Sequence, residues 1–403
     1  YDKAMSVPSS AGSADTKRGG RVLTVVLGVL LVVVVAAAII LGRGGGLLGR
    51  GNKDTGSSGF GDRGGVTQVH GVVGSEKRLY FEDPDVVNRL RELGYEVSFS
   101  TAGSRTIATR TDLSSLDFVS PSSAPATQKV REQNNGYTVE YPFFTPMAVA
   151  SWQPIADILE AEGVVRKENG GYVLDIAKYV DLAQSGKRWR DFGDTFPSPR
   201  TVQIRTTDIR TSNSAAMYLS VLAWEFAERE PNRDNDIGYL VDKITPFFTG
   251  QGYSESSSAG PFAEYLSQGM GAAPMVMIYE AQFIGEQMRP NSRIRNDMVL
   301  FHLSPTVLAN HGVVGITPEG QELARLLAND PELQQLAARH GFRPANHGSL
   351  ADEMSKQGLN PPSDYVNSVD PPQYDRLEQL IDGVGTRYGT LSPPPPEDGD
   401  EQQ

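Results

Sequence analysis

An uninterrupted apolar stretch near the beginning of the sequence constrains the folding of this chain more than any other feature. Residues 22–41 read VLTVVLGVLLVVVVAAAIIL and contain no charged side chain. As an α-helix, a stretch of this length rises about 30 Å, which matches the hydrocarbon core of a bilayer. Lys17, Arg18 and Arg21 closely precede it, and such a basic flank stays in the cytoplasm. The sequence therefore predicts a cytoplasmic N-terminus at 1–21, one transmembrane helix at 22–41, and an extracytoplasmic remainder.

Two alternatives to an uncleaved membrane anchor can be weighed for this stretch. A cleaved signal peptide could be processed at Ala36–Ala38, but the apolar run continues to Leu41 and is longer than a usual signal core. A buried core helix is disfavoured because the stretch has no polar face. Residues 42–65 follow and are rich in Gly, Ser, Asp and Lys, which predicts a flexible stalk.

Composition excludes several functions for the part of the chain beyond the stalk. The 403 residues carry a net charge of −12, although basic side chains outnumber acidic ones among the first fifty. The remainder is strongly acidic, which argues against nucleic-acid binding, because a basic face is needed to displace counterions from phosphates. The sequence has no Cys, which excludes disulfides, thiol catalysis, Cys-based zinc sites and a lipid-modified cysteine anchor.

Motifs of hydrolases, metalloenzymes and phosphate-binding loops are missing from the sequence. The five histidines have no paired spacing such as HExxH, and ordinary surface or capped histidines are the favoured interpretation; they are His70, His302, His311, His340 and His347. There is no GxSxG turn, and the glycines near residue 46 lack the Gly-Lys-Ser/Thr continuation of a phosphate loop. We therefore expect no catalytic residue, no metal and no cofactor.

The sequence between about Val66 and Pro344 alternates strand-like and helix-like segments. Strand-like runs lie at 66–73, 96–101, 117–120, 137–144, 202–206, 275–278 and 298–302. Helix-like runs lie at 86–93, 124–133, 215–228 and 281–288, and the pairs Asp83-Pro84, Thr317-Pro318 and Asp330-Pro331 are typical helix starts. This alternation predicts an α/β fold with βαβ units and a mostly parallel sheet.

Two further regions have an unusual composition. Residues 346–403 are rich in Pro, Asp, Ser and Asn and finish on an acidic sequence, which predicts a Pro-rich acidic tail, mostly disordered or loosely docked, with one short helix at Tyr374–Ile381. Lys187, Arg188 and Arg190 form the one basic cluster of the acidic body. That cluster is either a solvated loop or a docking patch for an envelope partner.

Small polar residues recur where predicted strands lead into helices. They are Ser75 and Glu76 after Gly74, Ser104 and Arg105 after Gly103, Ser120–Ser123, Thr211–Ser214, and Tyr279 with Glu280. In an open α/β sheet, ligands bind beyond the carboxyl ends of the strands, where helix N-termini offer free N–H groups. Each serine alone is more simply a helix cap, but the coincidence of several predicts a cleft for a small polar or anionic ligand.

The ordered series of these segments is similar to a known family. The segments are GSEK, AGSR, DFVSPSSAPA, YPFFTPMAVA, SNSAAM, MIYE, HGVVGIT and HGFRP. Together they resemble type II periplasmic solute-binding proteins, most closely the molybdate- and sulfate-binding kind, in a membrane-anchored form of the actinobacterial type. The resemblance implies two α/β lobes joined by two crossover hinge strands near Tyr141–Ala148 and His311–Thr317. Lobe I would comprise 66–145 and 311–345, and lobe II 146–310.

The resemblance also implies ligand contacts from both lobes. Ser75 and Ser104 correspond to oxyanion-binding serines of the first lobe, Ser212 or Ser214 would add contacts from the second, and Tyr279 matches a cleft tyrosine. The candidate ligand-binding residues are Ser75, Glu76, Ser104, Arg105, Ser122, Ser123, Ser212, Asn213, Ser214 and Tyr279. Arg105 could pair an anion through two hydrogen bonds, whereas Glu76 in the same cleft would repel it.

The function that this resemblance implies is capture of a small polar or anionic solute outside the bacterial cell membrane. The partner would be an ABC-type permease or another membrane protein of an envelope complex. The alternative is a scaffold or sensor of a cell-envelope assembly that uses the same fold with an empty or occluded cleft. An enzyme is the third hypothesis, and it would need a perturbed acid or base near Glu76 or Glu280 in a closed cleft.

Overall fold

The computed structural model describes residues 65–109, 111–251, 258–364 and 366–391. The predicted N-terminus at 1–21, transmembrane helix at 22–41 and nearly all of the stalk lie outside these residues. Within the four described ranges, no helix combines the length and the apolarity that crossing a membrane requires.

The first β-sheet is built around the N-terminal strands, and we call it, with its helices, lobe I. Its spatial order is β2 (Tyr95–Thr101), β1 (Thr67–Val73), β3 (Phe118–Ser120), β9 (Thr306–Gly315), β4 (Thr138–Trp152) and β10 (Arg343–Pro344). β1 pairs in parallel with β2 and β3, whereas β9 runs antiparallel to both β3 and β4. The sheet is therefore mixed rather than mostly parallel.

Helices cover both faces of the lobe I sheet. They are α2 (Arg78–Phe81), α3 (Pro84–Glu92), α4 (Ser104–Thr109), α5 (Ala124–Arg131), α13 (Pro318–Asn329) and α14 (Pro331–Arg339), with 3₁₀ turns η1 (Ser75–Lys77) and η2 (Leu113–Ser115). α3 begins at Pro84 because the Asp83 carboxylate accepts a hydrogen bond from the Asp85 N–H at 2.8 Å. The Asp330 carboxylate caps α14 and the Thr317 hydroxyl caps α13 in the same way, so all three predicted helix starts are confirmed.

The second sheet, with its helices, forms lobe II. Its order is β7 (Met275–Tyr279), β4, β8 (Met298–Ser304), β6 (Gly171–Asp175) and β5 (Val165–Glu168). The helices are α6 (Gln153–Ala161), α7 (Ile176–Gln184), α8 (Asn213–Arg229), α9 (Ile237–Ile244), α10 (Pro246–Thr249), α11 (Ala259–Gln268) and α12 (Glu280–Gln287), with η3 (Trp189–Phe192) and η4 (Pro231–Arg233). The predicted strand at 202–206 makes only an isolated bridge, between Arg205 and Val276.

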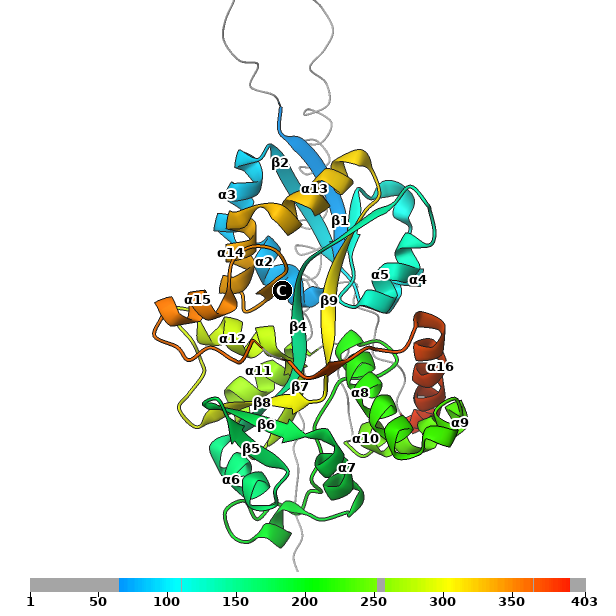
Figure 1. The fold of residues 1–403 in the computed structure, drawn as a ribbon, viewed down its shortest axis with the longest axis vertical. Coiled ribbons are helices and arrows are strands. Elements are labelled where there is room, and N and C mark those ends of the chain that lie inside the picture. The colour runs from blue at the N-terminus through cyan, green and yellow to red at the C-terminus, as the bar shows by residue number, and fades with distance from the viewer. Residues whose placement is uncertain (1–64, 110, 252–257, 365, 392–403) are drawn as a thin grey trace, which may run out of the picture. The chain divides into compact units, whose positions relative to one another are not determined.

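Two strands belong to both lobes. β4 pairs with β9 in lobe I and, beyond Pro146, with β7 and β8 in lobe II. Figure 1 shows β4 and β9 side by side between the lobes. The second crossover is β9 itself, which starts at Thr306 rather than at the predicted His311. Because the two crossovers are hydrogen-bonded to each other, they form one two-stranded hinge.

The C-terminal region differs from the expected mostly disordered tail, because the described part of it is folded. α15 (Leu350–Lys356) packs against α12, and β11 (Ser368–Val369) pairs with the start of β9. α16 (Tyr374–Gly385), visible beside α8 and α9 in Figure 1, is followed by η5 (Thr386–Leu391). Along α16, apolar residues at helical spacing enter the lobe II core; they are Leu377, Leu380, Ile381 and Val384. That apolar face outweighs the Pro- and Asp-rich composition around it.

Candidate ligand-binding site between the lobes

The polar turns of the two lobes meet around a small cavity of about 20 Å³, which we call the serine cavity. Its lining residues are Gly74, Ser75, Glu76, Ala102, Gly103, Ser104, Ser122, Thr211, Ser212, Asn213, Ser214, Ser258 and Tyr279. Eight of the ten candidate residues are among them. They are brought together because β1, β2 and β3 end at the same edge of the lobe I sheet, opposite the start of α8 and the end of β7. The cavity has room for about one water molecule.

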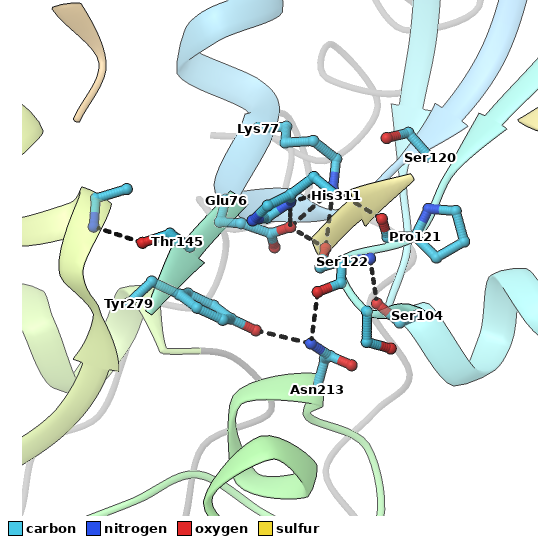
Figure 2. Close-up of polar contacts among 12 residues, drawn as sticks. Glu76, Lys77, Ser104, Ser120, Pro121, Ser122, Thr145, Asn213, Tyr279 and His311 are labelled. Carbon is cyan, nitrogen blue, oxygen red and sulfur yellow. Dashed lines mark hydrogen bonds and ion pairs between the residues drawn. The ribbon is translucent and has the colours of Figure 1, made fainter. Parts of the chain in front are cut away.

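Asn213 connects the two lobes across this cavity (Figure 2). Its side-chain amide donates to the backbone oxygen of Ser122 in lobe I at 3.3 Å and to the hydroxyl of Tyr279 in lobe II at 3.0 Å. Burial and the nearby charge of Glu76 raise the pKa of Tyr279, so its hydroxyl keeps its proton. The lobes therefore meet through polar groups that could also bind a solute.

Glu76 and Lys77 form a buried ion pair on the lobe I side of the cavity. The Lys77 ammonium is fully buried, and its Nζ lies 2.9 Å from Glu76 Oε1, 2.9 Å from Ser122 Oγ and 3.0 Å from His311 Nδ1. The Ser122 hydroxyl also donates to Glu76 Oε1. Burial alone would raise the pKa of Glu76, but the charge of Lys77 and the hydrogen bond from Ser122 outweigh it and hold that pKa well below its usual range.

This arrangement depends on the glycine that ends β1. A Cβ atom at Gly74 would overlap both Ser122 Oγ and Glu76 Oε1. The absence of a side chain at Gly74 therefore lets the first and third strand-to-helix turns of lobe I approach closely enough for Ser122 to reach the carboxylate.

His311 is a site residue that the sequence interpretation missed. It was expected to be a surface or capped histidine, but it is fully buried on β9 beside Lys77. Burial lowers the pKa of His311 to about 4, and the charge of Lys77 acts in the same direction. Neutral His311 accepts from Lys77 through Nδ1, so its proton resides on Nε2, which has no hydrogen-bond partner among the described residues. The sequence contained no signal for this contact, since the two residues are far apart in the chain.

On the lobe II side, three hydroxyl groups form a closed ring at the N-terminus of α8. Thr207 Oγ1 lies 2.7 Å from Ser212 Oγ and 2.9 Å from Ser214 Oγ, and the two serine hydroxyls lie 2.9 Å apart. All three residues are buried. Thr207 was not a candidate, although it follows the 202–206 segment as the other polar turns follow their strands.

Two candidate residues lie outside the lining of the serine cavity. Ser123 is buried at the N-terminus of α5. Arg105 points away from the cavity to the C-terminal helix α16, where its Nε lies 2.8 Å from Glu378 Oε1. Arg105 also donates to the backbone oxygen of Arg210. The guanidinium proposed for an anionic ligand is therefore paired with a carboxylate and joins lobe I to the lobe II side.

A larger groove of about 1400 Å³ opens from the same edge of the site. It shares Ser75, Glu76 and Tyr279 with the serine cavity. Its walls carry apolar, basic and acidic side chains, which include Phe99, Phe262, Phe342, Arg289, Arg293 and Glu286. Solvent thus reaches the interlobe region from this side.

No metal centre is evident in the part of the chain that the structure describes. Those residues contain no group of three or more His, Asp or Glu side chains close enough to hold a metal ion. The groups that line the serine cavity are hydroxyls, one amide and one carboxylate, which suit hydrogen bonding to a small molecule.

Comparisons with known proteins identify the fold. No family model matches the sequence, and no curated protein matches it. Among solved structures, a periplasmic thiamin binding protein is similar at 11% identity, with a TM-score of 0.54 over 83% of this chain and 100% of that one. A ferric binding protein from Campylobacter jejuni (9% identity, TM-score 0.48, 80% of this chain and 99% of that one) and the sulfate-binding protein SubI from Mycobacterium tuberculosis H37Rv (14%, 0.45, 75% and 93%) also align. The similarity to the thiamin binding protein shows that the described residues share the fold of that protein.

Proposed function

We propose that this chain is an extracytoplasmic solute-binding protein that captures a small polar solute between its lobes. In this proposal the apolar stretch 22–41 anchors the chain in the bacterial cell membrane, as in an actinobacterial membrane-anchored form, and the loaded protein presents its solute to an ABC-type permease. The role requires recognition without a covalent step, which agrees with a site made of hydrogen-bonding groups.

The observation that carries the proposal is the convergence of polar groups from both lobes on one cavity. Ser75, Ser104 and Ser122 come from lobe I, while Asn213 and Tyr279 come from lobe II. Burying polar side chains costs free energy unless they form hydrogen bonds, so such a cluster favours a site that binds a polar solute. A two-stranded hinge of β4 and β9 allows the lobes to separate. Opening at this hinge would enlarge the cavity, and a solute would replace the direct Asn213 contacts.

A scaffold or sensor is the second candidate, and the closed cleft favours it. The cavity is small, and Arg105 and Glu378 hold the lobe I side against α16. In that role the lobes would stay closed, and the surface of the folded C-terminal region would meet partners.

Thermal unfolding of the full chain in a mild detergent separates the two candidates. The panel comprises thiamin, sulfate, molybdate, Fe³⁺, sugars, amino acids and small amines. A true ligand at a hundred times its dissociation constant adds about 2.7 kcal/mol of stability, which for lobes of this size raises Tm by about 5 °C.

The variant Asn213→Ala should reduce the ligand-induced rise in Tm, because it removes the amide that faces both lobes. Asn134→Ala changes an exposed asparagine of lobe I and serves as the matched control. If no solute of the panel raises Tm, the solute-binding proposal fails and the scaffold is favoured.

A further inference from the structure

Among the described residues that line the serine cavity, Glu76 is the one with a formal charge. The other described lining groups are two glycines, Ala102, hydroxyls and the Asn213 amide. A ligand in this cavity therefore meets a negative charge and, from the described lining, no positive charge. Like charges repel strongly where water is excluded, so the electrostatics of the lining oppose a simple anion.

Lys77 does not offer its charge to a ligand. Its ammonium has 0% exposure and is surrounded by four acceptors, namely Glu76 Oε1, Ser122 Oγ, His311 Nδ1 and the backbone oxygen of Pro121. An ammonium has three protons to donate, and these acceptors use all of them. Lys77 therefore stabilises the ionised form of Glu76, but its ammonium does not line the cavity.

The two oxygens of the Glu76 carboxylate have different surroundings. Oε1 accepts hydrogen bonds from the Ser122 hydroxyl and the Lys77 ammonium, and it lies 3.5 Å from His311 Nδ1. Oε2 has no hydrogen bond or ion pair with any residue that the structure describes, and Figure 2 draws no contact to it. The Glu76 side chain is 11% exposed and lines both the serine cavity and the larger groove. The hydrogen bonds to Oε1 thus hold the carboxylate in place, and Oε2 can accept a hydrogen bond from a ligand.

Two of the donors that an anion could use are already engaged, although the Thr211 hydroxyl in the lining has no partner among the described residues. The Ser122 N–H donates to Ser104 Oγ at 2.9 Å, and the Arg105 guanidinium is paired with Glu378. The N-terminus of α8 remains, and its dipole can accept a negative group that is carried by the same ligand. Such a group would add to the contact at Glu76 without replacing it.

We infer that the solute bound in the serine cavity carries a protonated amine that binds Glu76 Oε2. This inference rests on the proposed solute-binding function and narrows its ligand class. An ammonium group supplies the donor that Oε2 lacks and neutralises the charge of the lining, and charge-assisted hydrogen bonds of this kind are among the strongest available in a protein. Glu76 then decides which solutes are bound and which are rejected.

Thermal unfolding of the full chain in detergent tests the ligand class with three sets of probes. Ethanolamine and putrescine are amines without a carboxylate, glycine and L-lysine carry both groups, and sulfate, molybdate and glucose carry no amine. At least one amine-bearing probe should raise Tm, and the amine-free probes should not. If only the amino acids raise Tm, the ligand also needs a carboxylate, which would bind at the N-terminus of α8. If ethanolamine or putrescine raises Tm, the amine contact with Glu76 is sufficient for binding.

Calorimetric titration with the responding probe then tests the residue. Glu76→Gln should weaken binding at least tenfold, because it replaces the charged acceptor with an amide. Glu76→Asp should keep part of the affinity, and Glu132→Gln, an exposed position on lobe I, should leave it unchanged. The double variant Glu76→Gln with Lys77→Met removes the buried cation too, so it tests the same loss of affinity even if the single variant folds poorly.

The outcomes distinguish this inference from the function on which it rests. A rise in Tm with sulfate, molybdate or glucose and none with amines overturns the amine inference and leaves solute binding in place. An amine that binds wild type and Glu76→Gln equally overturns the assignment to Glu76. If no probe of any class raises Tm, both the inference and the proposed function fail.

Discussion

Two buried glutamates of this molecule have similar partners and different surroundings. Glu76 at the serine cavity lies beside Lys77 and His311, and Glu280 at the start of α12 lies beside Arg343 and His302. Around Glu280, Arg343 Nε lies 2.8 Å from Oε1, Arg343 Nη2 lies 3.0 Å from Oε2, and His302 Nε2 lies 2.7 Å from Oε2. Both oxygens of Glu280 are therefore occupied, whereas Glu76 has one oxygen open.

This difference separates a structural carboxylate from one available for binding. Burial would raise the pKa of Glu280, but the hydrogen bonds from His302 and Arg343 lower it, so the group is an ionised link between strands that flank the hinge strand β4. Arg343 lies on β10 of lobe I and His302 on β8 of lobe II, and Glu280 connects them. In the enzyme hypothesis, the acid or base of a closed cleft lies near Glu76 or Glu280. Their surroundings suit Glu280 to holding the lobes together beside the hinge and Glu76 to binding a ligand.

The largest expected effect is the loss of stability in Glu280→Gln. This change removes the buried carboxylate that is paired with the Arg343 guanidinium, and breaking a buried ion pair from one side costs about 3–5 kcal/mol. Denaturant unfolding of the full chain measures it. Glu82→Gln is the matched control, because its partner Arg78 is exposed and such pairs contribute about 0–1 kcal/mol. Equal stability of the two variants would contradict a structural role for Glu280.

The next effect is a dependence of stability on pH that originates at His311. The folded chain keeps His311 neutral down to its pKa of about 4, whereas the unfolded chain binds that proton near the ordinary value of 6.5. The unfolded state therefore holds more protons between these values, and the free energy of unfolding falls by up to about 3 kcal/mol as pH drops through this window. Glu76, whose pKa is lowered, loses its contribution only at lower pH.

The variant His311→Asn keeps an acceptor for Lys77 and removes the titration. Denaturant unfolding between pH 7 and pH 4 should show a flatter profile for this variant than for the wild type. The charged neighbours of His311 are Lys77 and Glu76, and its other contacts are the aromatic rings of Phe143, Tyr279 and Phe342. His70→Asn, at an exposed position, is the control. Parallel profiles for His311→Asn and wild type would show that His311 is accessible to protons in the folded state.

Local signals in the sequence predicted much of the fold. The pairs Asp83-Pro84 and Asp330-Pro331 marked helix starts, because a capping carboxylate and a first-turn proline act within a few residues. The polar turns that line the serine cavity could also be anticipated, since parallel strands end at a common edge. The fifteen-residue length of β4 could not, because its second half is defined by partners in lobe II.

Features that depend on distant residues were missed. Lys77 and His311 meet only when β9 crosses from lobe II into lobe I, and neither residue stands in a recognisable motif. Arg105 follows a polar turn like the other candidates, but its long side chain reaches Glu378 on α16, a helix within a region expected to be mostly disordered. The two buried glutamates could not be told apart from the sequence for the same reason. Whether both oxygens of a carboxylate find partners depends on residues that are distant in the chain, such as Arg343 and His302 for Glu280.

The smallest expected effect is the loss of stability in His302→Gln. His302 lies beside Glu280 as His311 lies beside Glu76. His302 is 28% exposed and contacts one oxygen of Glu280, and Arg343 still binds both oxygens when His302 is changed. We expect a loss of about 1 kcal/mol, the usual contribution of one hydrogen bond, in denaturant unfolding at pH 7. Calorimetric titration with a bound amine should give the same affinity as wild type, because His302 does not line the serine cavity. A loss as large as that of Glu280→Gln would mean that Arg343 alone cannot keep the Glu280 carboxylate paired, and that the hinge depends on all three residues together.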